Sequence, residues 1–280
     1  MVIFDQAANG WLVSLKTSTA LVKVIAFFLA WAALWLPLAI PIAILLKCQP
    51  SKPLVPGQKL PLLAALYLVA PLILWGASWV DEVSLTDYGL EGNFTMLSSL
   101  CLGLGMGVLG LTIVFTSQWQ LGWVKWQGEN WQRLGKVSLP VLLLGLWIGI
   151  TEEVVFRGFL QNELQQDYSI WGAAAIASII FAFLHLIWEQ QNTLPQLPGL
   201  WLMGMVLVLA RWVDGGSLGL AWGLHAGWIW GLTCLDEAKL ISYTGKGPIW
   251  VTGVAGNPLA GVAGLVCLLL TVFFLLLVTP

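Results

Sequence analysis

Long apolar segments make up most of this sequence and restrict what it can fold into. A helix needs about 20 predominantly apolar residues to cross the hydrocarbon core of a bilayer, which is roughly 30 Å thick. Segments near that length lie at 24–46, 60–80, 95–115, 137–165, 171–187, 217–235 and 258–278, and a shorter one lies at 200–213. Because backbone polar groups find no partner in lipid, a spanning segment must be a helix or part of a closed barrel, and these lengths favour helices. The sequence therefore predicts an all-α, polytopic bundle of about eight transmembrane helices.

The charge content of the chain separates it from soluble proteins and from nucleic-acid-binding proteins. The chain is 59% hydrophobic and 9% charged, whereas a soluble domain has about 25% charged residues. The net charge is -2 and no long basic run occurs, which argues against a nucleic acid partner. The polar connecting segments are too short for an independent domain, so residues 1–280 are predicted to form a single integral membrane domain. A bacterial plasma membrane is the expected location, with a thylakoid or plastid membrane as the alternative.

The distribution of basic residues predicts an orientation in the membrane. If the spans alternate, one side of the membrane carries the basic loops at 47–59, 125–136 and 239–246. The loop after the second span has acids and no basic residue, and its acids are expected to be solvated: Asp81, Glu82, Asp87 and Glu91. The positive-inside rule makes the basic side cytoplasmic or stromal. Lys16 and Lys23 do not fit this orientation, because they precede the first span on the opposite side.

One predicted span carries charged residues where a simple membrane anchor would have leucines: Glu152, Glu153 and Arg157. A charge at the middle of a membrane helix costs about 2.5–3.5 kcal/mol or more, so it persists mainly where it faces the protein interior and has a function. Glu153 and Arg157 are four residues apart, in the order that favours an ion pair on a helix. Glu152 lies about 100° around the axis, so the two acids are predicted to have different environments, with Glu152 unpaired. Such a carboxylate suits general acid–base chemistry on a water molecule.

The only two histidines of the chain, His185 and His225, also lie in apolar spans. Phe181 precedes His185 by one helical turn and is expected to pack beside its ring. His225 lies in a segment whose glycines recur every four residues, at 219, 223, 227 and 231. Such a face allows close contact with another helix and turns the imidazole into a packed interior. At about 1.5 Å per residue, Glu152 and His225 fall near the centres of their spans and His185 lies roughly 10 Å nearer the basic side.

Each of these groups also has a purely structural interpretation. An intramembrane histidine is more often a hydrogen-bond partner between helices than a catalyst, and an ion pair inside a bundle fully explains Glu153 with Arg157. Two histidines and a glutamate are suitable zinc ligands, but no HExxH spacing occurs and the residues come from three helices. A metal-free, glutamate-dependent site is therefore favoured and no cofactor is predicted, with zinc as the alternative.

Three short motifs, on successive apolar segments, resemble the pattern of the CPBP family of intramembrane proteases: EEVVFR at 152–157, FAFLH at 181–185 and HAGWI at 225–229. The family includes CAAX prenyl protein endopeptidases and proteins linked to bacteriocin processing and immunity. The resemblance implies an intramembrane endopeptidase with a catalytic core at 137–235. It implies that Glu152 activates water with help from His185, that Glu153 and Arg157 orient the site, and that His225 stabilises the oxyanion. The substrate would be a membrane-associated or prenylated protein, cleaved near the cytoplasmic side of the bilayer.

One position departs from the family pattern. Where the family usually has Asn or another polar residue four positions after the last histidine, this chain has Ile229, whose side chain cannot form a hydrogen bond. Two hypotheses therefore stay open. One is an active endopeptidase. The other is a non-proteolytic scaffold or assembly factor that uses the same fold to bind another membrane protein or a pigment, which the eighteen tryptophans would also suit. A transporter is less favoured, because no inverted repeat is visible.

Overall fold

A computed structural model describes residues 10, 13–49, 52–188 and 190–278 of the chain. This part is almost entirely helical, which confirms the prediction of an all-α, polytopic membrane bundle. The long helices are α2 (Ala20–Leu45), α3 (Pro56–Asp81), α4 (Phe94–Gln120), α5 (Trp131–Glu153), α7 (Ile170–Leu184), α9 (Leu197–Val213), α10 (Gly219–Glu237) and α12 (Val262–Val278). The short elements are η1 (Gly128–Asn130), a π-helix η2 (Val154–Leu160), α6 (Gln161–Leu164), η3 (His185–Ile187), α8 (Gln190–Thr193), η4 (Leu194–Gln196), α11 (Ile249–Thr252), η5 (Val254–Gly256) and η6 (Pro258–Ala260).

Each predicted span forms a helix, but the helices differ in how well they suit a bilayer. Within the described residues, six helical segments are long and apolar enough to cross a membrane, and they begin at Ala20, Pro56, Phe94, Gly128, Ile170 and Leu194. Helix α12 is apolar but shorter. Helix α10 is not among the six, and more than half of its residues are buried. The helix that carries His225 is therefore a helix of the protein interior, as its glycine pattern predicts.

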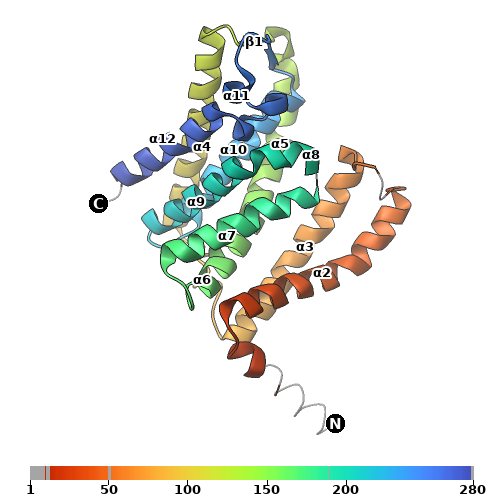
Figure 1. The fold of residues 1–280 in the computed structure, drawn as a ribbon, viewed down its shortest axis with the longest axis vertical. Helices are drawn as coiled ribbons and strands as arrows, with labels where there is room; N and C mark the ends of the chain where they lie inside the picture. Colours follow the sequence, from red (N-terminus) through yellow and green to blue (C-terminus); the bar gives the residue numbers. More distant parts are fainter. Residues whose placement is uncertain (1–9, 11–12, 50–51, 189, 279–280) are drawn as a thin grey trace.

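Helix α10 is the centre of the bundle because its glycine face allows close backbone contact with α4 (Figure 1). A Cβ atom on Gly227 would lie 2.7 Å from the carbonyl oxygen of Leu104, and one on Gly223 would collide with the carbonyl oxygen of Leu100. The contact is reciprocal, since a Cβ on Gly107 of α4 would lie 2.9 Å from the carbonyl oxygen of Leu224. The opposite side of α10 packs against α5. This arrangement fixes His225 against the helix that carries the two acids.

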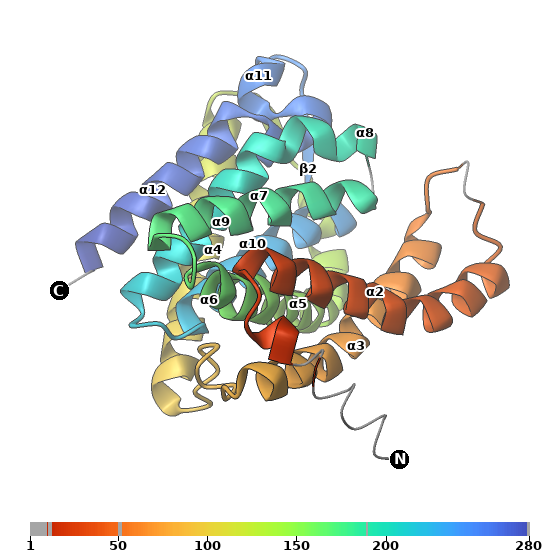
Figure 2. The ribbon, with the colours of Figure 1, turned by 60° about the horizontal axis from the view of Figure 1, so that its bottom comes forward.

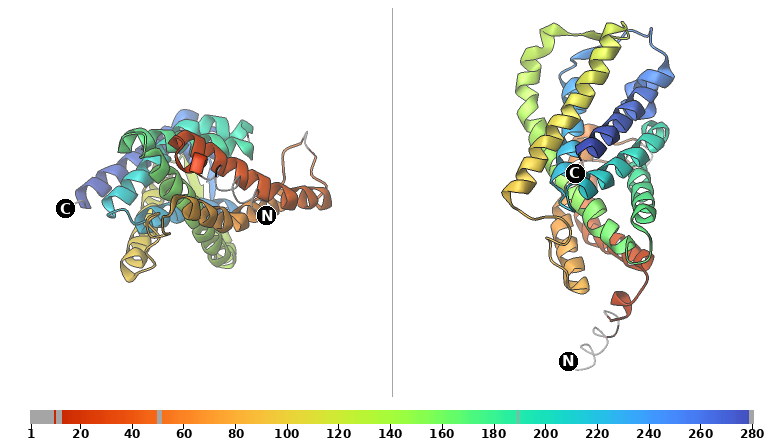
Figure 3. Two further views of the ribbon diagram at one scale, coloured as in Figure 1. Left: turned by 90° about the horizontal axis from the view of Figure 1, so that it is seen from below. Right: turned by 90° about the vertical axis from the view of Figure 1, so that its left-hand side faces the viewer.

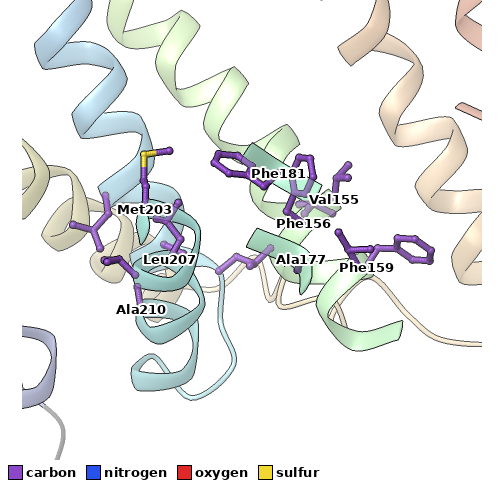
Figure 4. Packing of buried hydrophobic residues seen from close by; sticks show 14 of the residues in the cluster. Val155, Phe156, Phe159, Ala177, Phe181, Met203, Leu207 and Ala210 are labelled. Carbon is purple, nitrogen blue, oxygen red and sulfur yellow. The ribbon is translucent and has the colours of Figure 1, made fainter. Parts of the chain in front are cut away.

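A second group of helices, the π-helix η2 with α7 and α9, packs through aromatic and small side chains. Phe156 and Phe181 make an edge-to-face contact with ring centroids 5.1 Å apart. The small face of α7 meets α9 closely, since a Cβ on Gly204 would lie 2.6 Å from the hydroxyl oxygen of Ser178. Figure 4 shows the buried side chains that these three elements contribute: Val155, Phe156, Phe159, Ala177, Phe181, Met203, Leu207 and Ala210.

Helices α2 and α3 form a hairpin that projects from one side of the bundle (Figures 2 and 3). The indole N–H of Trp31 donates to the carbonyl oxygen of Leu66 at 3.0 Å, which joins the two helices. At the other end of the hairpin, Lys23 of α2 pairs with Asp81 of α3 at 2.9 Å and with Glu163 of α6 at 3.2 Å. The expectation that Asp81 is a solvated loop acid is therefore wrong. It is the last residue of α3, and its side chain is turned toward Lys23 instead of solvent.

A small antiparallel sheet closes one end of the bundle (top of Figure 1). Strand β1 (Val124–Trp126) follows α4 and strand β2 (Ile241–Tyr243) follows α10, with Lys125 opposite Ser242. The sheet brings together two of the basic loops that the alternating-span argument places on one side of the membrane. Each strand has only three residues, which is too little for the hydrophobic alternation that reveals longer strands in a sequence.

Candidate active site

The two acids lie where regular α-helix ends inside the bundle. Helix α5 stops at Glu153 and the chain continues as the π-helix η2, whose seven residues are all buried. Single turns of π-helix are rare and often occur at functional sites. The wider turn alters which side chains lie above one another, so the faces expected from a 3.6-residue period hold only approximately beyond Glu153. Arg157 lies within this π-helix.

Glu153 is the centre of a fully buried network. Its Oε1 atom accepts hydrogen bonds from Arg157 Nη1 at 3.0 Å and from His225 Nδ1 at 2.7 Å. The side chain of Glu153 has no exposed surface, and that of His225 is 4% exposed. Since an ionised carboxylate can only accept, Nδ1 of His225 carries the hydrogen and the ring is held in one orientation. The predicted ion pair between Glu153 and Arg157 is therefore present, and it also positions a histidine.

Glu152 faces a different environment, as predicted, but it is not unpaired. Its Oε1 atom accepts a short hydrogen bond from the hydroxyl of Tyr67, a residue of α3. Its Oε2 atom lies 3.7 Å from Nε2 of His225 and, within the described part of the chain, has no hydrogen-bond partner. The two atoms are too far apart for a direct hydrogen bond. Glu152 thus has one oxygen held by the protein and one directed to the histidine.

His185 is linked to the other site residues through an aromatic ring. Its Nδ1 atom donates to the backbone carbonyl of Phe181 at 2.8 Å, which fixes the ring and leaves Nε2 as an acceptor in the neutral form. The ring of Phe181 lies 4.6 Å from that of His185 and 6.1 Å from that of His225. The guanidinium carbon of Arg157 lies 4.5 Å from the centre of the same ring. Phe181 therefore packs among three of the five predicted site residues.

Glu152 and His185 line the same cavity, which has a volume of about 470 Å³. It lies between the α2–α3 hairpin and the helices α5, α7 and α9, and we call it the catalytic-side cavity. Tyr67, whose hydroxyl is bonded to Glu152, also lines this cavity. The rest of the lining is mainly apolar and aromatic, and it includes Phe28, Trp31, Trp35, Phe156 and Trp188. An apolar cavity with a few convergent polar groups is the usual form of a ligand or substrate site.

Arg211 of α9 stabilises the π-helix from outside the network. Its guanidinium donates to the backbone carbonyl of Arg157 in a short contact, to Asn162 Oδ1 at 2.9 Å and to the carbonyl of Gly216 at 2.9 Å. Next to it, Tyr88 of the loop after α3 covers Gly158. Burial, with nearby acids, raises the pKa of Tyr88 well above its ordinary value, so its hydroxyl stays neutral. These contacts hold the segment that carries Arg157 in place.

Four of the five predicted residues, Glu152, Glu153, Arg157 and His225, form one contiguous group. His185 lies on the cavity wall with Glu152, but no hydrogen bond joins it to the other four in the described structure. Sequence reasoning missed Tyr67. One signal was present: of the four tyrosines in the chain, Tyr67 is the only one within a predicted span.

The position that departs from the family pattern has a packing role. Ile229 faces α5, where a Cβ on Gly145 would lie 3.4 Å from its Cγ2 atom. The indole N–H groups on either side of this contact, from Trp222 and Trp230, donate to backbone carbonyls of α5 at 2.8 and 3.0 Å. Ile229 therefore belongs to the α5–α10 contact. The hydrogen-bond donor nearest to Glu152 comes from α3, as Tyr67.

The arrangement of the candidate residues can be compared with that of a metal site. Within the residues that the structure describes, no group of three or more His, Cys, Asp or Glu side chains is placed to hold a metal ion. One oxygen of Glu153 already accepts hydrogen bonds from both Arg157 and His225. Metal-free chemistry nevertheless stays a prediction.

Comparisons with known proteins identify the region around the site. Residues 135–231 match the family model described as Rce1-like, type II CAAX prenyl endopeptidase Rce1-like. The match contains all five predicted site residues and leaves Tyr67 outside. It confirms the resemblance to CPBP-type proteases that the three motifs indicate. A search of curated proteins and a search of solved structures found no significant match.

Proposed function

We propose that this integral membrane protein, whose residues 135–231 form an Rce1-like region, is an intramembrane endopeptidase that hydrolyses a peptide bond with water activated by Glu152. One observation carries the proposal. Glu152 lines an apolar cavity, and its buried Oε2 atom, which has no hydrogen-bond partner in the described structure, lies 3.7 Å from Nε2 of a histidine that a buried carboxylate orients. This combination of acid, oriented imidazole and enclosed space supports acid–base catalysis on a bound water.

In the proposed mechanism, a water molecule binds between Glu152 Oε2 and the substrate carbonyl. Glu152 takes one proton from this water while the water oxygen attacks the carbonyl carbon of the substrate. This gives a tetrahedral intermediate in which the former carbonyl oxygen is negative. Glu152 then gives the proton to the leaving nitrogen, and the C–N bond breaks to release an acid and an amine. His185, fixed by its bond to the Phe181 carbonyl, accepts a second hydrogen bond from the water and helps to orient it.

Two donors are available for the negative oxygen of the intermediate. The first is His225, whose Nδ1 is bonded to Glu153 and whose Nε2 lies on the side of Glu152 and donates when it carries a proton. The hydroxyl of Tyr67, which lies against Glu152 before reaction, is the second. Tyr67 thereby supplies the hydrogen bond that Ile229 cannot. One such donor is worth about 10²–10³ in rate.

The lining of the catalytic-side cavity supports an apolar substrate. Aromatic side chains surround the polar groups, so the cavity suits the lipid group or the apolar residues of a membrane-associated or prenylated protein. The α2–α3 hairpin forms one wall and faces the bilayer, which would let a substrate enter from the membrane. We place the protein in a bacterial plasma membrane, with a thylakoid or plastid membrane as the alternative.

The test compares two buried glutamates. The unmodified protein, Glu152→Gln and Glu163→Gln are purified in detergent and incubated with a farnesylated peptide that ends in a CAAX sequence, and mass spectrometry detects the products. Glu152→Gln is expected to reduce the rate by about 10²–10⁴. Glu163 is more deeply buried, with 3% of its side chain exposed against 12% for Glu152, but it lines neither cavity described here, so its variant should cleave at nearly the original rate per folded molecule. Equal cleavage by all three proteins, and by His185→Ala and His225→Ala, would refute the proposal.

Metal dependence is tested in the same assay. We expect cleavage to persist after dialysis against EDTA or 1,10-phenanthroline, because Glu152 supplies the base and Tyr67 with His225 supply the donors. Loss of cleavage that added zinc restores would instead assign Glu152 and His225 to a metal.

The second hypothesis, a non-proteolytic scaffold or assembly factor, is favoured by a different observation. Ile229 packs between helices instead of providing a polar group, and the aromatic lining of the cavity could hold a pigment or an apolar helix of another protein. Purification in mild detergent separates the two hypotheses. A stoichiometric partner that Glu152→Gln retains, together with no cleavage of any prenylated peptide by the unmodified protein, would support the scaffold.

A further inference from the structure

A second cavity lies at the end of the bundle that carries the β1–β2 sheet. Its volume is about 1200 Å³, and none of the five predicted site residues lines it. The wall combines amide and hydroxyl side chains with apolar ones, and comes from the segment before α5, the end of α10 and the segment 239–259. Gln196, just before α9, lines this cavity and the catalytic-side cavity. The two cavities therefore share a wall.

The free edge of strand β2 borders this second cavity. Hydrogen bonds join Thr244 to Trp123 at 2.9 Å and Gln127 to Leu240 at 2.8 Å. In an antiparallel ladder, hydrogen-bonded pairs alternate with non-bonded pairs. With this register, the N–H and C=O groups of Ile241 and Tyr243 point away from β1. Among the described residues, these backbone groups have no hydrogen-bond partner.

The cavity meets β2 along its edge. All three residues of β2 line it, whereas no residue of β1 does. Successive side chains of a strand point to opposite faces, so three consecutive lining residues indicate contact along the edge of the sheet. Across the cavity lies the segment around Gly256, whose carbonyl accepts from the Tyr243 hydroxyl at 3.3 Å. Unpaired, alternating donors and acceptors thus face an open space.

We propose that this edge of β2 binds an extended polypeptide segment of the substrate as a third strand. A polypeptide is the ligand that matches donors and acceptors alternating along an edge, and a lipid chain offers neither. The inference rests on the proposed function. A substrate bound at Glu152 continues past Gln196 into the second cavity, where its backbone pairs with Ile241 and Tyr243. Recognition through the backbone selects an extended conformation and tolerates many side chains.

Two proline substitutions test the protein side of this contact. The probe is a farnesylated twelve-residue peptide ending in a CAAX sequence, and its binding to the full chain carrying Glu152→Gln is measured by fluorescence anisotropy. Ile241→Pro removes an N–H that points to the cavity and leaves the β1–β2 ladder intact. Trp126→Pro, directly opposite in the register, removes the equivalent N–H at the far edge. We expect Ile241→Pro to weaken binding about three- to tenfold and Trp126→Pro to change it less than about twofold.

N-methylation of the peptide tests the same contact without altering the protein. Methyl groups placed one at a time along the peptide amides are expected to weaken binding at every second position, because only alternate amides face β2. A uniform effect along the peptide, or equal effects of the two proline variants, would overturn the inference even if the unmodified protein cleaves the peptide. A period of two in binding without any cleavage would support the strand contact and refute the endopeptidase.

Discussion

Two buried ion clusters lie in this bundle, and they differ in what they leave unpaired. The Lys23 cluster contains Lys23, Asp81 and Glu163 and joins α2, α3 and α6. The cavity network contains Glu152, Glu153, Arg157 and His225, with Tyr67 beside Glu152. Both combine two carboxylates with one permanent cation. Of the two clusters, only the cavity network has buried polar atoms for which the described part of the chain supplies no hydrogen-bond partner: Glu152 Oε2, Glu153 Oε2 and Arg157 Nη2.

This difference separates structural charges from candidate catalytic ones. In the Lys23 cluster, Gln166 adds a further acceptor for the ammonium at 3.3 Å, so the charge is met from three sides. The cluster lines neither cavity described here. In the cavity network, one of the residues with an unpaired atom, Glu152, lines a cavity. Buried polar groups normally have hydrogen-bond partners. A buried polar group without a partner beside a cavity therefore indicates a functional site better than burial or charge alone.

The largest expected effect on stability in this comparison is the loss that follows when the Lys23 cluster is broken. Lys23→Met leaves two buried carboxylates without their cation and should lower the free energy of unfolding by about 3 kcal/mol, the low end for a broken buried pair, because the cluster lies near helix ends. Thermal unfolding in detergent measures the change. Cleavage per folded molecule should stay within about twofold, since nothing in the cavity changes.

A triple variant checks the cause of that loss. Lys23→Met combined with Asp81→Leu and Glu163→Leu removes all three charges together, and much of the lost stability should return, because a well-packed apolar replacement of a buried ion pair is often neutral. A triple variant as unstable as Lys23→Met alone would show that packing around the lysine, and not its charge, stabilises this end of the bundle.

The next effect concerns two buried tyrosines that differ in their partners. Tyr67 donates to Glu152, whereas the hydroxyl of Tyr88 has no partner in the described structure. Tyr67→Phe should reduce kcat by about 10²–10³, as expected for loss of one oxyanion donor. Tyr88→Phe removes the same atom from an equally buried ring and should leave kcat nearly unchanged. Cleavage rates of the two variants, at matched amounts of folded protein, provide the measurement. Similar rates for both would exclude Tyr67 from the mechanism.

Double-mutant cycles are expected to show smaller energies, and they distinguish a cluster that affects catalysis from one that affects stability. Glu153→Gln and His225→Ala remove two ends of the 2.7 Å contact, and their coupling is expected at about 0.5–3 kcal/mol in kcat/KM. The corresponding cycle of Lys23→Met with Glu163→Gln should show its coupling in the free energy of unfolding. Coupling of the first pair in stability alone would mean that Glu153 and His225 form a structural pair.

Hydropathy and helical spacing predict a large part of this molecule. Apolar length identifies the helices because lipid imposes it directly. The spacing of Glu153 and Arg157 predicts their ion pair, and the four-residue glycine repeat predicts the close contact that surrounds His225. These features are local in the sequence, since each depends on residues within one helix. The glycines of α4 that complete the contact, Gly103 and Gly107, were not recognised, although their four-residue spacing is itself a signal for close helix packing.

Long-range pairs account for what the sequence could not predict. Tyr67 is 85 residues from Glu152, and Lys23 is 58 residues from Asp81. Helix spacing says nothing about which helices become neighbours, so neither contact follows from either segment alone. Lys23 does not fit the orientation that the positive-inside rule predicts. Its pairing offers a reason, because the charge of Lys23 is balanced by acids within the protein. The π-helix was also missed, because no residue type in VVFRGFL distinguishes it from an α-helix.

The smallest expected effect comes from an exposed ion pair on the same hairpin as the Lys23 cluster. Lys16 lies 2.7 Å from Glu82, and its hydrogen bond and charge lower the pKa of that carboxyl from its usual value of 4.5. A group whose pKa is lowered by folding adds stability above its unfolded pKa, and this contribution disappears as the pH falls through the lowered value. Lys16→Gln should therefore reduce the unfolding temperature slightly at neutral pH, and the reduction should vanish once the pH has fallen below the lowered pKa of Glu82. Added salt should also remove the difference, because exposed pairs are screened. If Lys16→Gln lowered the unfolding temperature as much as Lys23→Met, the exposed pair would stabilise the protein as strongly as the buried cluster. The N-terminal end of α2 would then be held by Lys16 as strongly as by the buried cluster.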